Sequence, residues 1–295
     1  MGPLCRESGG GTTMRERKRA AMKKIYVMTD LEGVAGVLDS VNWCLSDGRY
    51  YDQAKVLLTL EVNAAVSGFF DGGAVHVVVS DGHGPGGINP ALIDPRVDLI
   101  RGWPNGWPLE MGGSYDAVAF VGQHAKASTE RAHLCHTQNM RHINFSINGV
   151  SIGEFGQLAM CASELEVRTI FGSGDEAFTR EARALVPGIE TVSVKRGLRK
   201  GQGLDLTDEQ YRRHNTGAVH VPPERARMLI RAGACRGLAR ARKEKFGIIK
   251  MRPPYARTVI LRPTRDYPLR QISKERHPRS VIALLNMEYK PRPIT

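Results

Sequence analysis

Short apolar runs rich in β-branched residues alternate with longer helical patterns along most of this chain. The first run, at residues 25–28, is followed by apolar side chains at helical spacing over 52–70, and a second run follows at 75–79. Two parallel strands need a crossover connection between them, which a helix usually supplies. The alternation therefore predicts an α/β fold with a mostly parallel central sheet flanked by helices.

The same alternation continues further along the chain. We expect strands at 97–100, 117–121 and 167–171, a hairpin that turns at Asn148-Gly149, a helix at 155–164, and another helix capped by Asp175 that ends before Pro187. Beyond residue 195 the pattern is helical at 222–245 and strand-like at 248–251 and 258–261. This change predicts a smaller C-terminal α+β portion.

Charge also divides the chain into three parts. Residues 1–24 hold 7 basic and 2 acidic residues, 25–194 hold 10 basic and 20 acidic, and 195–295 hold 25 basic and 8 acidic. We predict a disordered basic extension at 1–22, a metal-binding α/β catalytic domain at 23–195, and the basic C-terminal α+β portion at 196–295. An acidic middle attracts cations, whereas the basic C-terminal third is typical of a solvated outer face.

The cysteines and the apolar runs indicate a cytoplasmic protein without a membrane segment. No apolar run approaches the roughly 18 residues of a membrane span, and no signal-peptide core is visible near the start. The five cysteines are scattered and form no CxxC pair, which suggests neither a disulfide framework nor a thiolate zinc site. They are Cys5, Cys44, Cys135, Cys161 and Cys235.

Ligand-type side chains follow the ends of the expected strands. Asp30 and Glu32 follow the first strand, His83 follows the second, His124 follows the strand at 117–121, and Glu154 precedes a helix. The carboxyl ends of parallel strands meet at one edge of a sheet, where α/β proteins keep their sites. We therefore expect these five residues to converge at that edge.

Three carboxylates and two imidazoles form an oxygen and nitrogen ligand set that suits zinc. Five ligands exceed what one catalytic zinc normally uses, so two metals sharing a carboxylate are the expectation. Taken singly, each residue has an ordinary alternative, such as a turn or a solvated carboxylate. The joint pattern is what predicts a metal-dependent hydrolase.

A further histidine, His136, follows His124 by twelve residues. It is a candidate general acid or base, or a hydrogen-bond donor to the tetrahedral intermediate. His133 and His142 lie close by in the sequence, and spacing alone does not choose among the three histidines.

Several segments resemble one known family, the zinc-dependent D-aminopeptidases of the DppA type, peptidase family M55. The segments occur in family order over roughly residues 23–195. They are Met28-Thr29-Asp30-Leu31-Glu32-Gly33, Ser80-Asp81-Gly82-His83, Gly122-Gln123-His124-Ala125-Lys126-Ala127-Ser128-Thr129, Cys135-His136-Thr137, Asn148-Gly149, Gly153-Glu154-Phe155-Gly156 and Gly174-Asp175. The stretch between His124 and His136 is one residue longer than the family pattern, and the Arg/Pro-rich C-terminal end lacks the family's long closing helix.

The resemblance implies a site, a substrate and an assembly. It implies two zinc ions per subunit, a bridging Asp30, and Glu32, His83, His124 and Glu154 as the other ligands. His136 matches the family's active-site histidine. Family members cleave N-terminal D-amino acids from short peptides and assemble into a decameric ring around an inner chamber, so we expect a peptide substrate and a self-associating chain.

Three other functions compete with this interpretation. Asp30-Leu31-Glu32-Gly33-Val34 faintly resembles the nucleophile motif of haloacid-dehalogenase phosphatases, but that motif needs Asp and Thr where Glu32 and Val34 stand. The basic C-terminal third suggests nucleic-acid binding, although it shows no aromatic stacking motif, helix-turn-helix or zinc finger. The same metal site could also hydrolyse amides that are not peptides.

Overall fold

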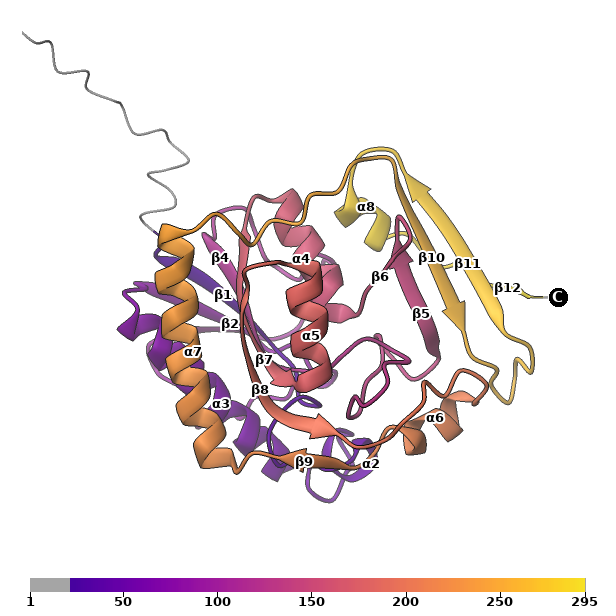
Figure 1. Ribbon diagram of the computed structural model, residues 1–295, viewed down its shortest axis with the longest axis horizontal. Helices are drawn as coiled ribbons and strands as arrows, with labels where there is room; N and C mark the ends of the chain where they lie inside the picture. The colour runs from indigo at the N-terminus through magenta and orange to yellow at the C-terminus, as the bar shows by residue number, and fades with distance from the viewer. Residues whose placement is uncertain (1–21, 295) are drawn as a thin grey trace, which may run out of the picture.

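The central feature of the fold is a seven-stranded sheet in the order β3-β2-β1-β4-β7-β8-β9 (Figure 1). The computed structural model describes residues 22–294, so the extension predicted at 1–22 lies outside the described residues except for Met22. The strands are β1 (Lys24–Thr29), β2 (His76–Ser80), β3 (Asp98–Ile100), β4 (Ala117–Gln123), β7 (Arg168–Asp175), β8 (Glu190–Gly197) and β9 (Ala218–His220). All pair in parallel except β9, which confirms the predicted fold class.

Helices cover both faces of this sheet because successive side chains of a strand point to opposite sides. Ile25 and Val27 belong to the core beneath α3 (Tyr51–Asp71) and α7 (Pro223–Lys243). Tyr26 and Met28 belong to the core on the other face, with α4 (Glu154–Glu164) and α5 (Glu176–Leu185). In Figure 1, α3 and α7 lie on one side of the sheet and α4 and α5 on the other.

Two local signals in the sequence are confirmed by the backbone. Asp175 caps α5, with its carboxylate accepting a hydrogen bond from the Phe178 N–H at 2.7 Å. Asn148 and Gly149 have φ angles of 49° and 80°, the left-handed pair that a tight hairpin requires. They join β5 (His142–Ile147) to β6 (Val150–Ser151).

A second, antiparallel sheet lies beyond α4 and α5, in the order β12-β11-β10-β5-β6 (Figure 1). In it β10 (Tyr255–Leu261) pairs with β5 on one side and with β11 (Gln271–His277) on the other, and β11 pairs in turn with β12 (Arg292–Pro293). The C-terminal third thus contributes strands to both sheets and α7 to the first core. The boundary predicted between residues 195 and 196 therefore rests on composition and charge.

The prediction of a strand at 248–251 is wrong. This segment pairs with no strand in the part of the chain that the structure describes; instead the Ile249 N–H donates to Ser163 Oγ at 2.9 Å, and Ile249 and Met251 pack against the core beneath α4. Its apolar character reflects burial rather than sheet pairing. The segment at 258–261 does form a strand, as part of β10.

Short helices complete the fold: α2 (Ser40–Trp43), α6 (Asp208–His214) and α8 (Val281–Leu285). Over residues 22–294, no helix has both the length and the apolar character needed to cross a membrane.

Candidate metal centre

The five predicted ligands and His136 converge at the carboxyl edge of the seven-stranded sheet. They form two groups, Asp30 with Glu32 and His83, and His124 with His136 and Glu154. Within each group the ligand atoms lie within 4.8 Å of one another. The groups adjoin, because His124 Nε2 lies 3.2 Å from Asp30 Oδ2.

Glycines bring the loop after β1 close enough to the end of β4 to form the site. The Gly33 N–H donates to the Gly122 carbonyl at 2.7 Å. Gly122 has a φ of +77°, and a Cβ there would lie 2.0 Å from the Asp30 carbonyl oxygen. Only glycine allows this approach, which places Asp30 beside His124.

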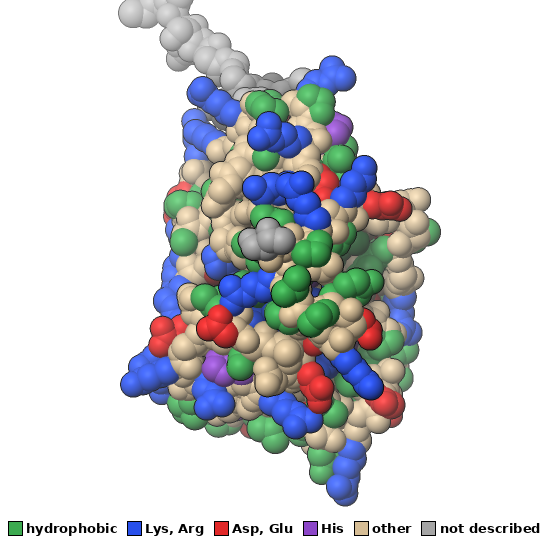
Figure 2. All heavy atoms as spheres, turned by 90° about the vertical axis from the view of Figure 1, so that its right-hand side faces the viewer, with side chains coloured by type: hydrophobic (Ala, Val, Ile, Leu, Met, Phe, Trp, Pro, Cys, Tyr) green, Lys and Arg blue, Asp and Glu red, His purple; other side chains and the backbone are tan. Residues whose placement is uncertain are grey.

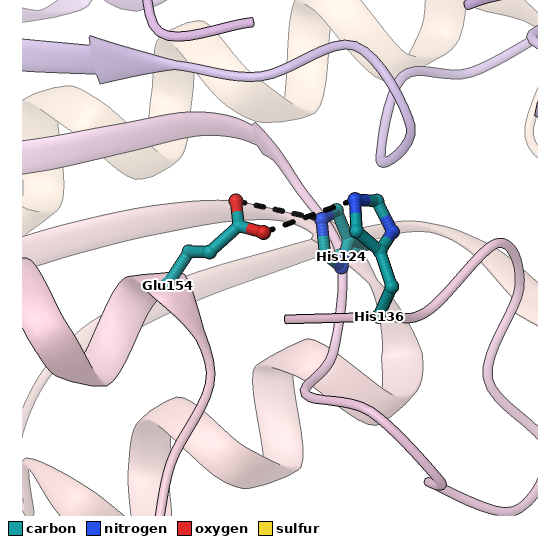
Figure 3. Close-up of side chains that lie close together, drawn as sticks. All are labelled: His124, His136 and Glu154. Carbon is teal, nitrogen blue, oxygen red and sulfur yellow. Dashed lines mark ion pairs between the residues drawn. The ribbon is translucent and has the colours of Figure 1, made fainter. Parts of the chain in front are cut away.

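Glu154 faces two stacked histidine rings (Figure 3). The rings of His124 and His136 lie 4.1 Å apart with an interplanar angle of 17°. Glu154, the first residue of α4, places Oε2 3.7 Å from His124 Nε2 and Oε1 3.8 Å from His136 Nε2. This carboxylate therefore adjoins both imidazoles at separations wide enough for an ion between them.

Backbone carbonyls determine which ring nitrogen of each histidine faces the site. His124 Nδ1 lies 2.8 Å from the Ala125 oxygen, and His136 Nδ1 lies 2.9 Å from the Leu134 oxygen. A carbonyl only accepts hydrogen bonds, so each Nδ1 carries a proton and each Nε2 faces the site, where it offers a lone pair to a metal when the ring is neutral. A hydrogen bond from the ring nitrogen that does not face the metal orients histidine ligands in this way in metal sites.

Unpaired buried atoms support a cation at this position. Within residues 22–294, Glu32 Oε2, His83 Nδ1 and His124 Nε2 are buried without a hydrogen-bond partner. Buried polar atoms are normally paired, and leaving them unpaired is costly. An ion coordinated by these oxygen and nitrogen atoms would satisfy them, and the donor set suits zinc. The residues present therefore fit a metal.

The electrostatics point the same way. Burial and the neighbouring Glu32 carboxylate raise the pKa of Asp30 from 3.8 to about 7. Burial opposes the charge of Glu32, yet His83 lowers the Glu32 pKa well below its usual range, and Glu32 overcomes burial to raise the pKa of His83 to about 9. Bound protons offset the negative charge of these clustered carboxylates in the metal-free site. A cation would offset the same charge in their place.

The three candidate histidines lie in different surroundings. Of the three, only His136 lines the cavity of the metal centre. His133 Nε2 lies 3.0 Å from the Leu38 oxygen, and burial together with Lys195 lowers its pKa to about 2. His142 Nδ1 lies 3.2 Å from Asn139 Oδ1. Position favours His136, and its role in catalysis stays a prediction.

Buried side chains that the sequence pattern did not single out hold the loop at 31–38. Lys195 Nζ donates to the Glu32 carbonyl, and Glu61 Oε1 accepts from the Ala35 N–H at 2.9 Å. His220 Nδ1 also accepts from the Gly36 N–H at 3.0 Å. A signal for Glu61 existed, because it adjoins Leu58 and Val62 on the apolar side of the 52–70 pattern. Lys195 and His220 left no comparable signal.

Gln123 was also missed, although it precedes His124 in the sequence. Its Nε2 donates to Asp30 Oδ2 at 3.0 Å, and the Leu31 N–H donates to Asp30 Oδ1 at 2.8 Å. These two bonds hold the carboxylate that lies between the two groups.

A cavity of about 500 Å³ opens onto the metal centre, which is within the range of small-ligand sites. Its acidic side is formed by Asp30, Glu32 and Glu154. Its apolar lining includes Trp103, Trp107, Leu109, Met140 and Leu158, and Arg212 of α6 also lines it. The cavity therefore offers charged and apolar walls to one small ligand.

The phosphatase alternative is not supported by this geometry, because His83 and His124 stand in the same site as Asp30 and Glu32. Nucleic-acid binding is not supported either, since many arginines of the C-terminal third pair with acidic residues. Arg231 lies 2.7 Å from Asp71, and Arg236 and Arg240 lie 3.0 and 3.1 Å from Glu190. On the face shown in Figure 2, basic side chains are scattered among acidic and apolar ones.

Comparisons with known proteins agree with the site. The family model of the M55 peptidases, described as D-aminopeptidase, matches residues 22–266. A D-aminopeptidase of Bacillus subtilis (strain 168) is 29% identical over 180 residues, and the match covers 59% of this chain. The chain spans 64% of the length of that curated relative.

A solved structure has the same fold. It is described as Zn-dependent D-aminopeptidase DppA from Bacillus subtilis, a self-compartmentalizing protease. The match has a TM-score of 0.73 at 20% identity and covers 88% of this chain and 93% of that one. The arrangement of sheets and helices is therefore shared along most of both chains.

Proposed function

Because this chain belongs to the M55 family of D-aminopeptidases, we propose that it is a zinc-dependent aminopeptidase that removes N-terminal D-amino acids from short peptides. The observation that carries the proposal is the pair of adjoining ligand groups, with unpaired buried atoms, on one cavity. The related protein described as a D-aminopeptidase supports the substrate class.

The proposed site holds two zinc ions. Asp30 would bridge them, with Glu32 and His83 on one side and His124 and Glu154 on the other. The position of Asp30 supports this, since it belongs to the first group and lies 3.2 Å from His124 of the second. When bound, such ions lower the pKa of water and polarise a carbonyl group.

His136 is the proposed acid–base group. Its Nε2 carries the lone pair and faces Glu154 at 3.8 Å, so it can accept a proton at that atom. Burial and the neighbouring His124 lower the His136 pKa, which keeps the ring neutral before the reaction. Glu154 in turn accepts a hydrogen bond from the Gln138 N–H, which orients its carboxylate toward both rings.

Self-association and a cytoplasmic location complete the proposal. The solved relative is described as self-compartmentalizing, which supports assembly of this chain, with a decameric ring as the specific form. Light scattering coupled to gel filtration would measure the number of subunits. Free thiols at Cys44, Cys135 and Cys161 suit a reducing compartment.

Metal analysis combined with a chiral substrate pair tests the function. Purified protein reconstituted with zinc should hold two ions per chain and should cleave the p-nitroanilide of D-alanine in preference to that of L-alanine, with loss of activity upon chelation. Asp30→Ala should lose both metals, whereas the exposed Asp47→Ala should keep them. Unchanged zinc content in Asp30→Ala would contradict the assignment.

A further inference from the structure

One cationic side chain from the C-terminal third, Arg212, lines the cavity of the metal centre. Among the described residues that line this cavity, it is the one lysine or arginine. It lies on α6, a helix that follows His136 by about seventy residues in the sequence and that the apolar periodicity did not predict. The same cavity is thus lined by three carboxylates, which can hold cations, and by one guanidinium, which can bind an anionic group.

Helix α6 is held firmly against the segment that carries His136. Tyr211, which is 1% exposed, accepts a hydrogen bond at its hydroxyl from the Ser128 N–H at 2.8 Å. The guanidinium of Arg262 lies 3.7 Å from the centre of the Tyr211 ring. Asn215 Nδ2, just after the helix, donates to the Cys135 carbonyl at 2.6 Å. The neighbouring Arg212 is therefore presented to the cavity by a fixed element.

Arg212 itself has no ion pair or hydrogen bond within residues 22–294. The next residue on the helix, Arg213, pairs with Glu209 at 3.4 Å, and its side chain is 82% exposed. Many other arginines of the C-terminal third are paired with acidic side chains or buried. A half-buried guanidinium that faces a cavity without a partner is available to an anionic ligand.

We infer that Arg212 binds the free C-terminal carboxylate of the substrate, so that the site prefers short peptides with an unblocked C-terminus. The inference rests on the proposed function, which places the amino end of the peptide at the metal centre. Each extended residue spans about 3.3–3.6 Å, so a peptide of a few residues has its two ends within the dimensions of a cavity of this size. The apolar wall that includes Trp103 and Trp107 would contact the side chains between them.

The test compares D-alanyl-D-alanine with its C-terminal amide on the zinc-loaded full chain. The wild type should have a higher kcat/KM for the free acid. Arg212→Gln should reduce the ratio of the two kcat/KM values by about ten-fold or more, mainly through the KM of the acid, because a charge-assisted hydrogen bond is lost. Arg212→Lys keeps a charge without the planar fork and should retain part of the preference.

Arg213→Gln is the matched control, because it removes the same charge from the same helix outside the cavity. It should leave the ratio unchanged. Equal hydrolysis of acid and amide by the wild type, or an unchanged ratio in Arg212→Gln, would overturn the inference and leave the proposed function standing. If neither compound is hydrolysed, and the alanine anilides are not hydrolysed either, the proposed function and the inference are overturned together.

Discussion

Glu61 should make the stability of this protein depend on pH. Its side chain is buried in α3 at 1% exposure, with Oε1 bound to the Ala35 N–H and Oε2 without a partner among the described residues. Burial raises the pKa of Glu61 from 4.5 to about 7, against the opposing effect of the Ala35 hydrogen bond. The folded protein therefore binds this proton more tightly than the unfolded chain does.

The sign and size of the effect follow from linkage. A carboxylic acid with a raised folded pKa stabilises the fold below its unfolded pKa, and this stabilisation is lost as the pH rises from about 4.5 to about 7. The difference corresponds to about 3 kcal/mol of unfolding free energy at neutral pH and above. Glu61→Gln retains an acceptor for the Ala35 N–H and cannot ionise, so it should not suffer this loss.

Urea denaturation followed by circular dichroism, on chelator-treated protein, would measure the effect. Glu61→Gln should match the wild type near about pH 4, below the unfolded pKa, and exceed its unfolding free energy by up to about 3 kcal/mol near about pH 8. The exposed Glu130→Gln should stay within about 0.5 kcal/mol of wild type at both values. A constant difference between Glu61→Gln and wild type across this range would refute the reasoning.

Three further changes test the metal centre and its support. His136→Ala should keep both metals but lose about 10²–10⁴-fold in kcat, and full activity with normal zinc content would refute its role. Lys195→Met should lower the unfolding free energy by about 1–3 kcal/mol in denaturation, because the carbonyl of Glu32 loses its buried donor; an unchanged midpoint would count against that contact. Gly122→Ala should reduce the zinc content in elemental analysis, because the added Cβ would lie 2.0 Å from the Asp30 carbonyl oxygen and would push Asp30 away from His124. A normal zinc content would show that the site does not depend on this close approach of the backbone.

The sequence alone determined the type of sheet and the edge that carries the site. Period and length of the apolar runs set strands apart from helices, and a parallel sheet brings all its carboxyl ends to one edge. Asp30, His124 and Glu154 could therefore be predicted to converge without knowledge of the strand order. Local chemistry also sufficed for the Asp175 cap and for the hairpin at Asn148-Gly149.

Only the tertiary structure decided which side chains meet within that edge. The pairing of β1 with β4 places Asp30 beside His124, and the fold of the loop after β4 turns His136, rather than His133, toward the cavity. The pairing of β5 with β10 joins parts of the chain that are far apart in the sequence. The same holds for the packing of α6, which brings Arg212 to the cavity. Local periodicity reports which face of an element is buried, but long-range pairing depends on the shapes of both partners, and no single segment encodes it.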